Sequence, residues 1–172
     1  NFWNFVGAGV FGFIINLPIV NYYEHGTYLT VNHGHAALMG VYGNLAVAAM
    51  LFCSRYLIHP DKWSPRLLTC SFWSMNIGLV LMVAMDLFPA GILQLAAVLD
   101  NGLWFARSQQ FVLSTPFQTF TWMRAVGGAI FVVGGVFPLV VFLVTRLGAI
   151  KEGTAADQEV GEPIAREAVQ EV

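Results

Sequence analysis

The chain has 172 residues, of which 57% are hydrophobic and 10% are charged, and its formal net charge is −2. Soluble domains carry roughly 25% charged residues, so this composition excludes an ordinary soluble protein. Acidic residues cluster after position 149. We therefore expect a membrane-embedded body over residues 1–150, an acidic and mostly disordered tail over residues 151–172, and no nucleic-acid partner.

Four segments are long and apolar enough to cross a lipid bilayer, which needs about 20 mostly apolar residues. They lie at about 2–22, 35–57, 67–95 and 120–147. The sequence thus predicts an all-α integral membrane protein with four transmembrane helices. The chain begins without Met, and residues 2–20 lack the features of a signal peptide, so we expect it to be the C-terminal part of a longer protein.

Two features modify these expected helices. Pro89 and Gly91 interrupt the outer end of the third segment, where we expect a bend or tilt. The fourth segment contains the glycine pairs 127–128 and 134–135. Such small residues allow a neighbouring helix to approach closely.

The distribution of positive charge predicts the orientation in the membrane. The connection at 54–66 carries three basic residues, and Arg146 and Lys151 stand at the start of the tail, whereas the connection at 21–32 carries none. Because Lys and Arg accumulate on the cytoplasmic side, both ends of the chain are expected there. The connection at 21–32 then faces outward.

The sequence NHGH at 32–35 places two histidines at the start of the second span. An ionisable side chain at this position is costly, so a functional site is the first interpretation. Residues i and i+2 of an α-helix point about 200° apart, so His33 and His35 cannot share one metal ion. They can bind two partners on opposite sides of one helix, such as two haem irons, or they can be helix-end histidines bonded to water or backbone.

The small residues after these histidines favour the cofactor interpretation, because a flat macrocycle can lie close to a helix surface made of Ala and Gly. They are Ala36, Ala37, Gly40 and Gly43.

Asp86 is the one acidic residue inside an expected span. A buried carboxylate there must be neutral or paired. Two interpretations remain open. Asp86 lines a route for protons or quinol, or it is a protonated acid bonded to a neighbouring helix, for example through Gln94 or Asn76.

The segments NLPIVNYYEHGT at 16–27 and NHGHAALMGVYG at 32–43 resemble the catalytic subunit of bacterial nitric oxide reductase, in the haem-copper oxidase superfamily. Supporting similarity lies in FWSMNIGL at 72–79, LFPAG at 87–91, WFARS at 104–108 and WMR at 122–124. The resemblance covers about residues 1–147 and is strongest in the quinol-dependent, single-chain branch. It implies a multi-pass protein of the bacterial inner membrane, whose helices form the C-terminal part of a haem-copper oxidase-like bundle.

The resemblance also implies roles for individual residues. In the family, the first histidine of the pair is the axial ligand of the high-spin haem b, and the second binds the low-spin haem b. By this correspondence His33 binds the high-spin iron and His35 the low-spin iron. His25, Arg107 and Arg124 become candidate partners for the haem propionates, because a cation stabilises a carboxylate.

Two further residues are candidates of another kind. Glu24 is a candidate for a proton path from the outside, with a capping or surface role as the alternative. The family often has a Gly-Asp pair at the start of the last span, where this chain has Gly127 and Gly128. If that acid binds quinol in relatives, its absence weakens the expectation of a quinol donor.

The implied reaction joins two molecules of nitric oxide with two electrons and two protons to give nitrous oxide and water. It needs two haems b and a non-haem iron, whose ligands in the family are three histidines and a glutamate on earlier spans. Beyond the NHGH pair this sequence has only His25 and His59, which are expected on opposite sides of the membrane. The chain is therefore expected to be inactive without the upstream helices of the catalytic polypeptide.

Two alternatives remain open. The chain is part of an oxygen-reducing haem-copper terminal oxidase, whose copper site lacks the extra glutamate ligand. Or it is a membrane scaffold or transporter segment without haem.

Overall fold

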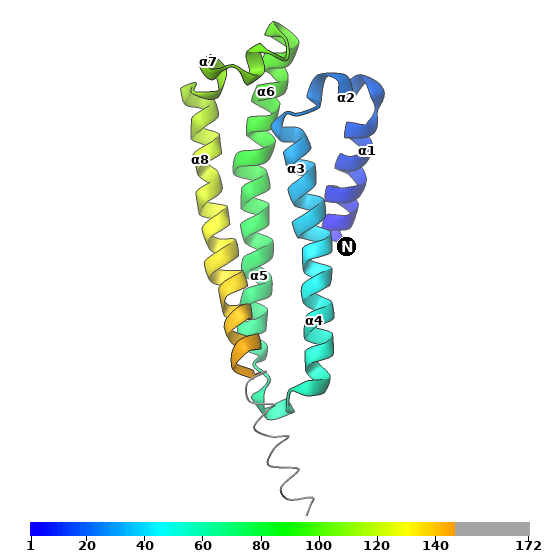
Figure 1. Cartoon of the computed structure of the whole chain (residues 1–172), viewed down its shortest axis with the longest axis vertical. Helices are drawn as coiled ribbons and strands as arrows, with labels where there is room; N and C mark the ends of the chain where they lie inside the picture. Colours follow the sequence, from blue (N-terminus) through cyan, green and yellow to red (C-terminus); the bar gives the residue numbers. More distant parts are fainter. Residues whose placement is uncertain (147–172) are drawn as a thin grey trace, which may run out of the picture.

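Three long helices make up most of the computed structural model, which describes residues 1–146. They cover Tyr28–Leu57, Pro65–Asn101 and Thr115–Arg146, and each is long and apolar enough to cross a membrane. All three run along the long axis of the molecule (Figure 1). The regular structure of the described residues is helical, which confirms the expected helical membrane bundle. The acidic tail lies outside the described residues.

Each long helix contains an internal π-helical segment, a wider turn that often accompanies functional sites. The first consists of α3 (Tyr28–Ala37), η2 (Leu38–Gly43) and α4 (Asn44–Leu57). The second consists of α5 (Pro65–Met82), η4 (Val83–Leu87) and α6 (Phe88–Asn101). The third begins with α8 (Thr115–Ala129) and η6 (Ile130–Val136).

The N-terminal segment is a broken helix. It consists of η1 (Asn4–Val10), α1 (Phe11–Asn16) and α2 (Pro18–Glu24), and α2 is bent by 95° from the preceding helix. Leu17 has an extended backbone with ψ of 125° because the ring of a following proline disfavours the helical conformation. The straight part of the expected span at 2–22 therefore ends at Asn16, and α2 lies across one end of the bundle (Figure 1).

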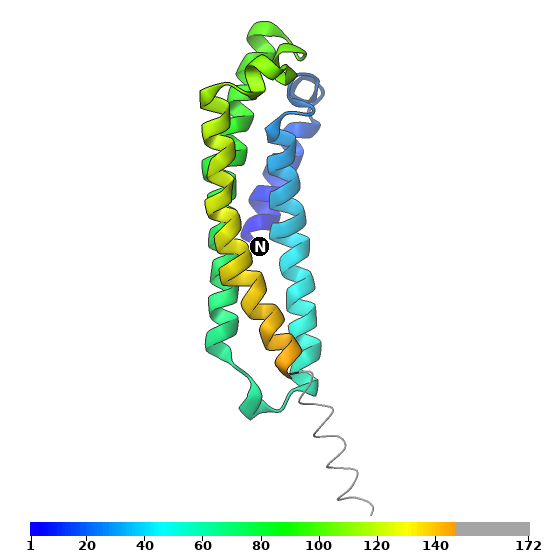
Figure 2. The same cartoon turned by 60° about the vertical axis from the view of Figure 1, so that its left-hand side comes forward.

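Short elements complete the chain. The turn η3 (Pro60–Lys62) joins α4 to α5, while η5 (Phe105–Arg107) and α7 (Gln109–Val112) join α6 to α8. Figure 2 shows that the η5–α7 connection and α2 lie at the same end of the molecule, with η3 at the opposite end. We call the first of these the α2–α7 end.

The interior is formed where α5 packs against α8 and η6, and where α3 packs against η1 and α6. Close approach of α5 and α8 depends on glycine. A Cβ atom at Gly78 would lie 2.7 Å from the backbone oxygen of Gly127, so neither position has room for a side chain. Gly134 and Gly135 likewise face Ser74 and Met75, whereas Gly128 faces open space. The glycines of the last helix thus serve helix packing, as expected from the sequence, except at Gly128.

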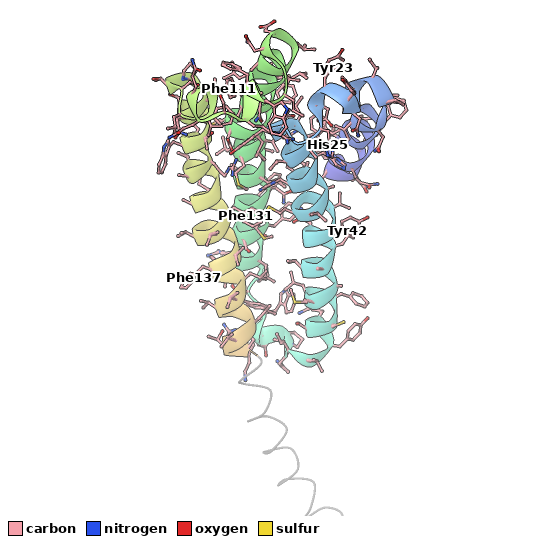
Figure 3. All side chains as sticks on the ribbon, turned by 45° about the horizontal axis from the view of Figure 1, so that its top comes forward. Tyr23, His25, Tyr42, Phe111, Phe131 and Phe137 are labelled. Atoms are coloured by element: carbon pink, nitrogen blue, oxygen red, sulfur yellow. The ribbon has the colours of Figure 1, made fainter. Side chains whose placement is uncertain are left out.

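Large apolar side chains cover the outside of the bundle. Tyr42 and Phe137, which Figure 3 labels, are each 64% exposed, and Trp122 is 73% exposed. A surface of this kind is stable against lipid or further apolar helices and costly in water. The exposed surface therefore agrees with membrane embedding.

Candidate functional site

His33 lies on the face of α3 that packs against the N-terminal helix. Its Nδ1 atom is 2.8 Å from the backbone oxygen of Gly7. A Cβ atom at Gly12 would lie 3.0 Å from the Cε1 atom of the same ring, so the absence of a side chain at Gly12 leaves space for the imidazole. When Nδ1 carries the proton and donates it to Gly7, the lone pair of Nε2 is free to bind a metal.

His35 is held in the same way by its own helix. Its Nδ1 atom is 3.0 Å from the backbone oxygen of Val31, one turn earlier. His33 and His35 are both within α3, so the regular helix directs the two side chains about 200° apart. Space beside Gly34, between them, is open.

The donor set fits two haem groups, one on each side of α3. An axial imidazole usually donates its other ring N–H to a carbonyl or carboxylate, which fixes the tautomer and the orientation of the ring. Both histidines have a backbone carbonyl in that place. Among residues 1–146 no three side chains of His, Cys, Asp or Glu come together as a metal cluster.

Two of the four small residues after the histidines have a different role from the one expected. Ala36 is fully buried, and a Cβ atom at Gly7 would lie 2.7 Å from its Cβ atom. A Cβ atom at Gly40 would lie 2.6 Å from the ring of Trp3. Ala36 and Gly40 are therefore small because η1 packs against them, and they do not present an open surface to a macrocycle.

His25 and Arg107 come together at the α2–α7 end, where Figure 3 labels His25. The Nη2 atom of Arg107 donates to the backbone oxygen of His25 at 3.2 Å. The guanidinium group also lies against Gly26, whose φ of 74° favours glycine. Both side chains are exposed, so an imidazole and a guanidinium group are available beside the start of α3.

Glu24 is buried at the end of α2, with 1% of its surface exposed. The hydroxyl of Thr30 lies 3.4 Å from one carboxylate oxygen. Burial raises the pKa of Glu24 above its ordinary value of 4.5, while Thr30, His25 and His33 act in the opposite direction. Burial therefore makes Glu24 hold its proton more tightly than an exposed carboxyl group does.

Asp86 has a partner that the sequence did not indicate. The Nε atom of Arg124 in α8 lies 2.5 Å from its Oδ2 atom, and Asp86 is fully buried. The guanidinium carbon of Arg124 lies 5.2 Å from the ring centroid of Tyr28, the first residue of α3. This corrects one expectation, since the partner of Asp86 is Arg124 and not Gln94 or Asn76.

Gln94 and Asn76 have other partners. Gln94 accepts a hydrogen bond from the backbone N–H of Tyr28 at 2.9 Å and donates to the backbone oxygen of Ala106 at 3.0 Å. Asn76 accepts from the indole N–H of Trp3 at 2.9 Å. Gln94 thus ties the start of α3 to α6 and η5, a positioning role that was not expected from the sequence. The sequence feature that could have revealed this role is an amide side chain within an otherwise apolar span.

Comparison with known proteins identifies the class. Residues 1–130 match the family described as cytochrome c and quinol oxidase polypeptide I. The chain belongs to this family of haem-copper oxidases, membrane oxidoreductases with haem and metal cofactors.

The chain is also similar to an individual protein. The relative is a subunit of the nitric oxide reductase of Stutzerimonas stutzeri, and it is 33% identical over 143 residues, which cover 76% of this chain and 28% of the relative. The chain therefore spans less than a third of the length of this relative, and corresponds to part of a larger polypeptide.

Proposed function

We propose that this chain is the haem-binding C-terminal part of a membrane nitric oxide reductase. The observation that carries the proposal is the pair His33 and His35, each with Nδ1 on a backbone carbonyl and Nε2 free, on two sides of α3. The 33% identity to part of a nitric oxide reductase supports the choice of substrate. The reaction takes two NO, two electrons and two protons to N2O and water.

His33 would hold the high-spin haem b and His35 the low-spin haem b. The haems, when bound, would supply electron transfer and a site for the substrate, and a non-haem iron would be bound by residues outside this chain. The chain itself orients the two imidazoles. Gly7 and Val31 supply the carbonyl groups that keep Nδ1 protonated and raise the basicity of Nε2.

His25 and Arg107 would bind haem propionates at the α2–α7 end, which we place on the outer side of a bacterial inner membrane. Support comes from their contact with each other and from their exposure beside the start of α3. Arg124 is a weaker candidate because its Nε atom already binds Asp86.

Glu24 is a candidate for proton uptake from the same side. It is a buried carboxyl group with a raised pKa, it precedes the exposed His25 in the chain, and it contacts Thr30 of α3, the helix that carries His33. Asp86 has the weaker claim to a proton or quinol route, since its carboxylate is paired with Arg124.

The test is the haem content of the whole protein and of two variants. A pyridine haemochrome assay should find haem b. His33→Ala should remove the high-spin optical and magnetic signals, and His35→Ala the low-spin ones. His59→Ala is the matched control, because His59 is exposed and bonds to Asp61 in the connection between α4 and α5. Absence of haem b would show a membrane scaffold without haem, and unchanged spectra in both variants would show that His33 and His35 do not bind the haems.

A second candidate, oxygen reduction, is favoured by the family match, since that family is named for oxidases. Anaerobic NO consumption and O2 consumption by the intact protein separate the two activities. Activity with reduced quinol and with reduced cytochrome c, measured in parallel, identifies the electron donor. We expect NO reduction with quinol, and the Gly127-Gly128 pair is the departure from the family pattern that makes the donor assay necessary.

A further inference from the structure

Two buried polar atoms of the Asp86–Arg124 pair lack a hydrogen-bond partner. The Nε atom of Arg124 binds the Oδ2 atom of Asp86, which leaves Oδ1 of Asp86 and Nη2 of Arg124 buried and unpaired. A buried polar atom without a hydrogen-bond partner is destabilising, so native proteins nearly always supply a partner. The pair therefore requires a further group that accepts from the guanidinium and donates to the carboxylate.

Asn32, the residue before His33, has the same deficit. Its Oδ1 atom is buried without a partner, and the residue is 1% exposed. Among the described residues one more side chain, that of Arg146, has a buried atom without a partner, and it lies at the far end of the last helix. If the unpaired atoms of Asn32, Asp86 and Arg124 lie close together, one bound group can be the missing hydrogen-bond partner of all three.

Helix geometry directs Asn32 toward the ion pair. At about 100° per residue, Asn32 points about 40° from Tyr28 and about 60° from Leu29. The ring of Tyr28 lies against Arg124 of α8, and the backbone and side chain of Leu29 lie against Gly91 of α6. The side chain of Asn32 is thus directed at the seam between α6 and α8.

The register of α3 against α6 places Asn32 at the right height. The two helices run in opposite directions in Figure 1, and Leu29 is beside Gly91. The step of three residues from Leu29 to Asn32 along α3 therefore corresponds to a step of three residues back along α6, from Gly91 to Phe88. Asp86 is two residues beyond that point, about 3 Å along the axis at 1.5 Å per residue, and η4 is in contact with α3.

We propose that an internal water molecule binds between α3, η4 and α8 and bridges Asn32, Asp86 and Arg124. It accepts from Nη2 of Arg124 and donates its two hydrogens to Oδ1 of Asp86 and Oδ1 of Asn32. One donor and two acceptors are the complement of a single water, and buried waters typically make about three hydrogen bonds. The bridge fixes α3 at the residue before His33, in addition to the bond from Gln94 to Tyr28.

The first experiment is a structure of the intact, unaltered protein at a resolution that shows ordered water. We expect density about 2.7–3.2 Å from each of the three atoms. Direct contact of Asn32 with Asp86, a haem propionate on Nη2 of Arg124, or a dry seam would each overturn the proposal. This readout does not depend on NO reduction, so it fails or succeeds separately from the proposed function.

Thermal unfolding of variants provides the second experiment. Asn32→Leu and Asp86→Asn should lower Tm singly, and the double variant should lose clearly less than the sum, because either change removes the shared water. Asn76→Leu is the control. Asn76 binds Trp3 and is ten residues from Asp86 along the same long helix, so its effect should add to that of Asp86→Asn. Additive loss for Asn32→Leu and Asp86→Asn would contradict a shared bridge.

Discussion

The imidazole of His33 and the backbone of Gly7 meet at 2.8 Å, although 26 residues separate them in the chain. The contact joins α3 to η1, so the orientation of this imidazole depends on how the broken N-terminal helix packs. A substitution in η1 keeps the backbone carbonyl group that His33 contacts, because every residue has one, but the added side chain changes how η1 packs against α3. Substitutions at the glycines of the N-terminal helix that contact His33 should therefore change the position of its imidazole.

Gly12→Ala should disturb the haem that we propose at His33 and spare the one that we propose at His35. The added Cβ atom would lie 3.0 Å from Cε1 of His33, which is tighter than ordinary contact, so the ring must shift or tilt. We expect a change in the high-spin spectrum with the low-spin spectrum unchanged. Gly128→Ala is the control, because no atom lies within 4 Å of a Cβ there. Equal spectra for both variants would mean that Gly12 does not position the imidazole.

The helical spacing of His33 and His35 was sufficient to predict that they point to different sides of α3, because that angle depends on the local helix alone. The partners across the bundle were not predictable in the same way. Asp86 and Arg124 are 38 positions apart, and their contact depends on the rotation of two helices about their axes. Sequence spacing carries no information about that rotation.

Composition located the long apolar segments and misjudged two details. Pro18 divides the first segment because the conformation of Leu17, and not its hydropathy, decides where the helix ends. Ala36 and Gly40 were expected to face a cofactor and instead face η1. Small residues allow close approach of any group, so their presence alone does not distinguish a helix from a haem.

Gln94→Leu should destabilise the end of the bundle where α3 begins. The change leaves the N–H of Tyr28 and the carbonyl of Ala106 without their partners, and each buried unpaired group costs about 1–3 kcal/mol. Thermal unfolding should show a clear fall in Tm. Gln110→Leu, at an exposed position, should leave Tm almost unchanged. A similar Tm for the two variants would show that the Gln94 bonds contribute little.

Removal of Asp86 should cost more than removal of the whole ion pair. Asp86→Ala leaves the charge of Arg124 without its partner. We expect a loss of about 3 kcal/mol, at the low end for a buried pair because Arg124 is 35% exposed and solvent screens part of its charge. The double variant Asp86→Leu with Arg124→Met should recover most of that loss. Denaturation of the three proteins in one detergent gives the comparison, and a double variant as unstable as Asp86→Ala would contradict it.

Stability should depend on pH through Glu24. Because burial raises the pKa of this carboxyl above 4.5 in the folded state, the folded protein holds the proton more tightly than the unfolded chain. The stability that this group contributes is then fully present below about pH 4.5, and it is lost as the pH rises through the pKa of Glu24 in the folded state. Glu24→Gln keeps a neutral acceptor near Thr30 and removes the ionisation.

The Tm of Glu24→Gln should therefore rise relative to the unaltered protein as the pH increases from 4 to 8. Asp100→Asn is the control for a carboxylate that is exposed, and its Tm difference should stay nearly constant over the same range. A constant difference for Glu24→Gln as well would mean that Glu24 ionises as freely in the folded protein as in the unfolded chain. It would also remove the support for Glu24 as a holder of protons, because a carboxyl group with its ordinary pKa is almost fully ionised at neutral pH and has no proton to pass on.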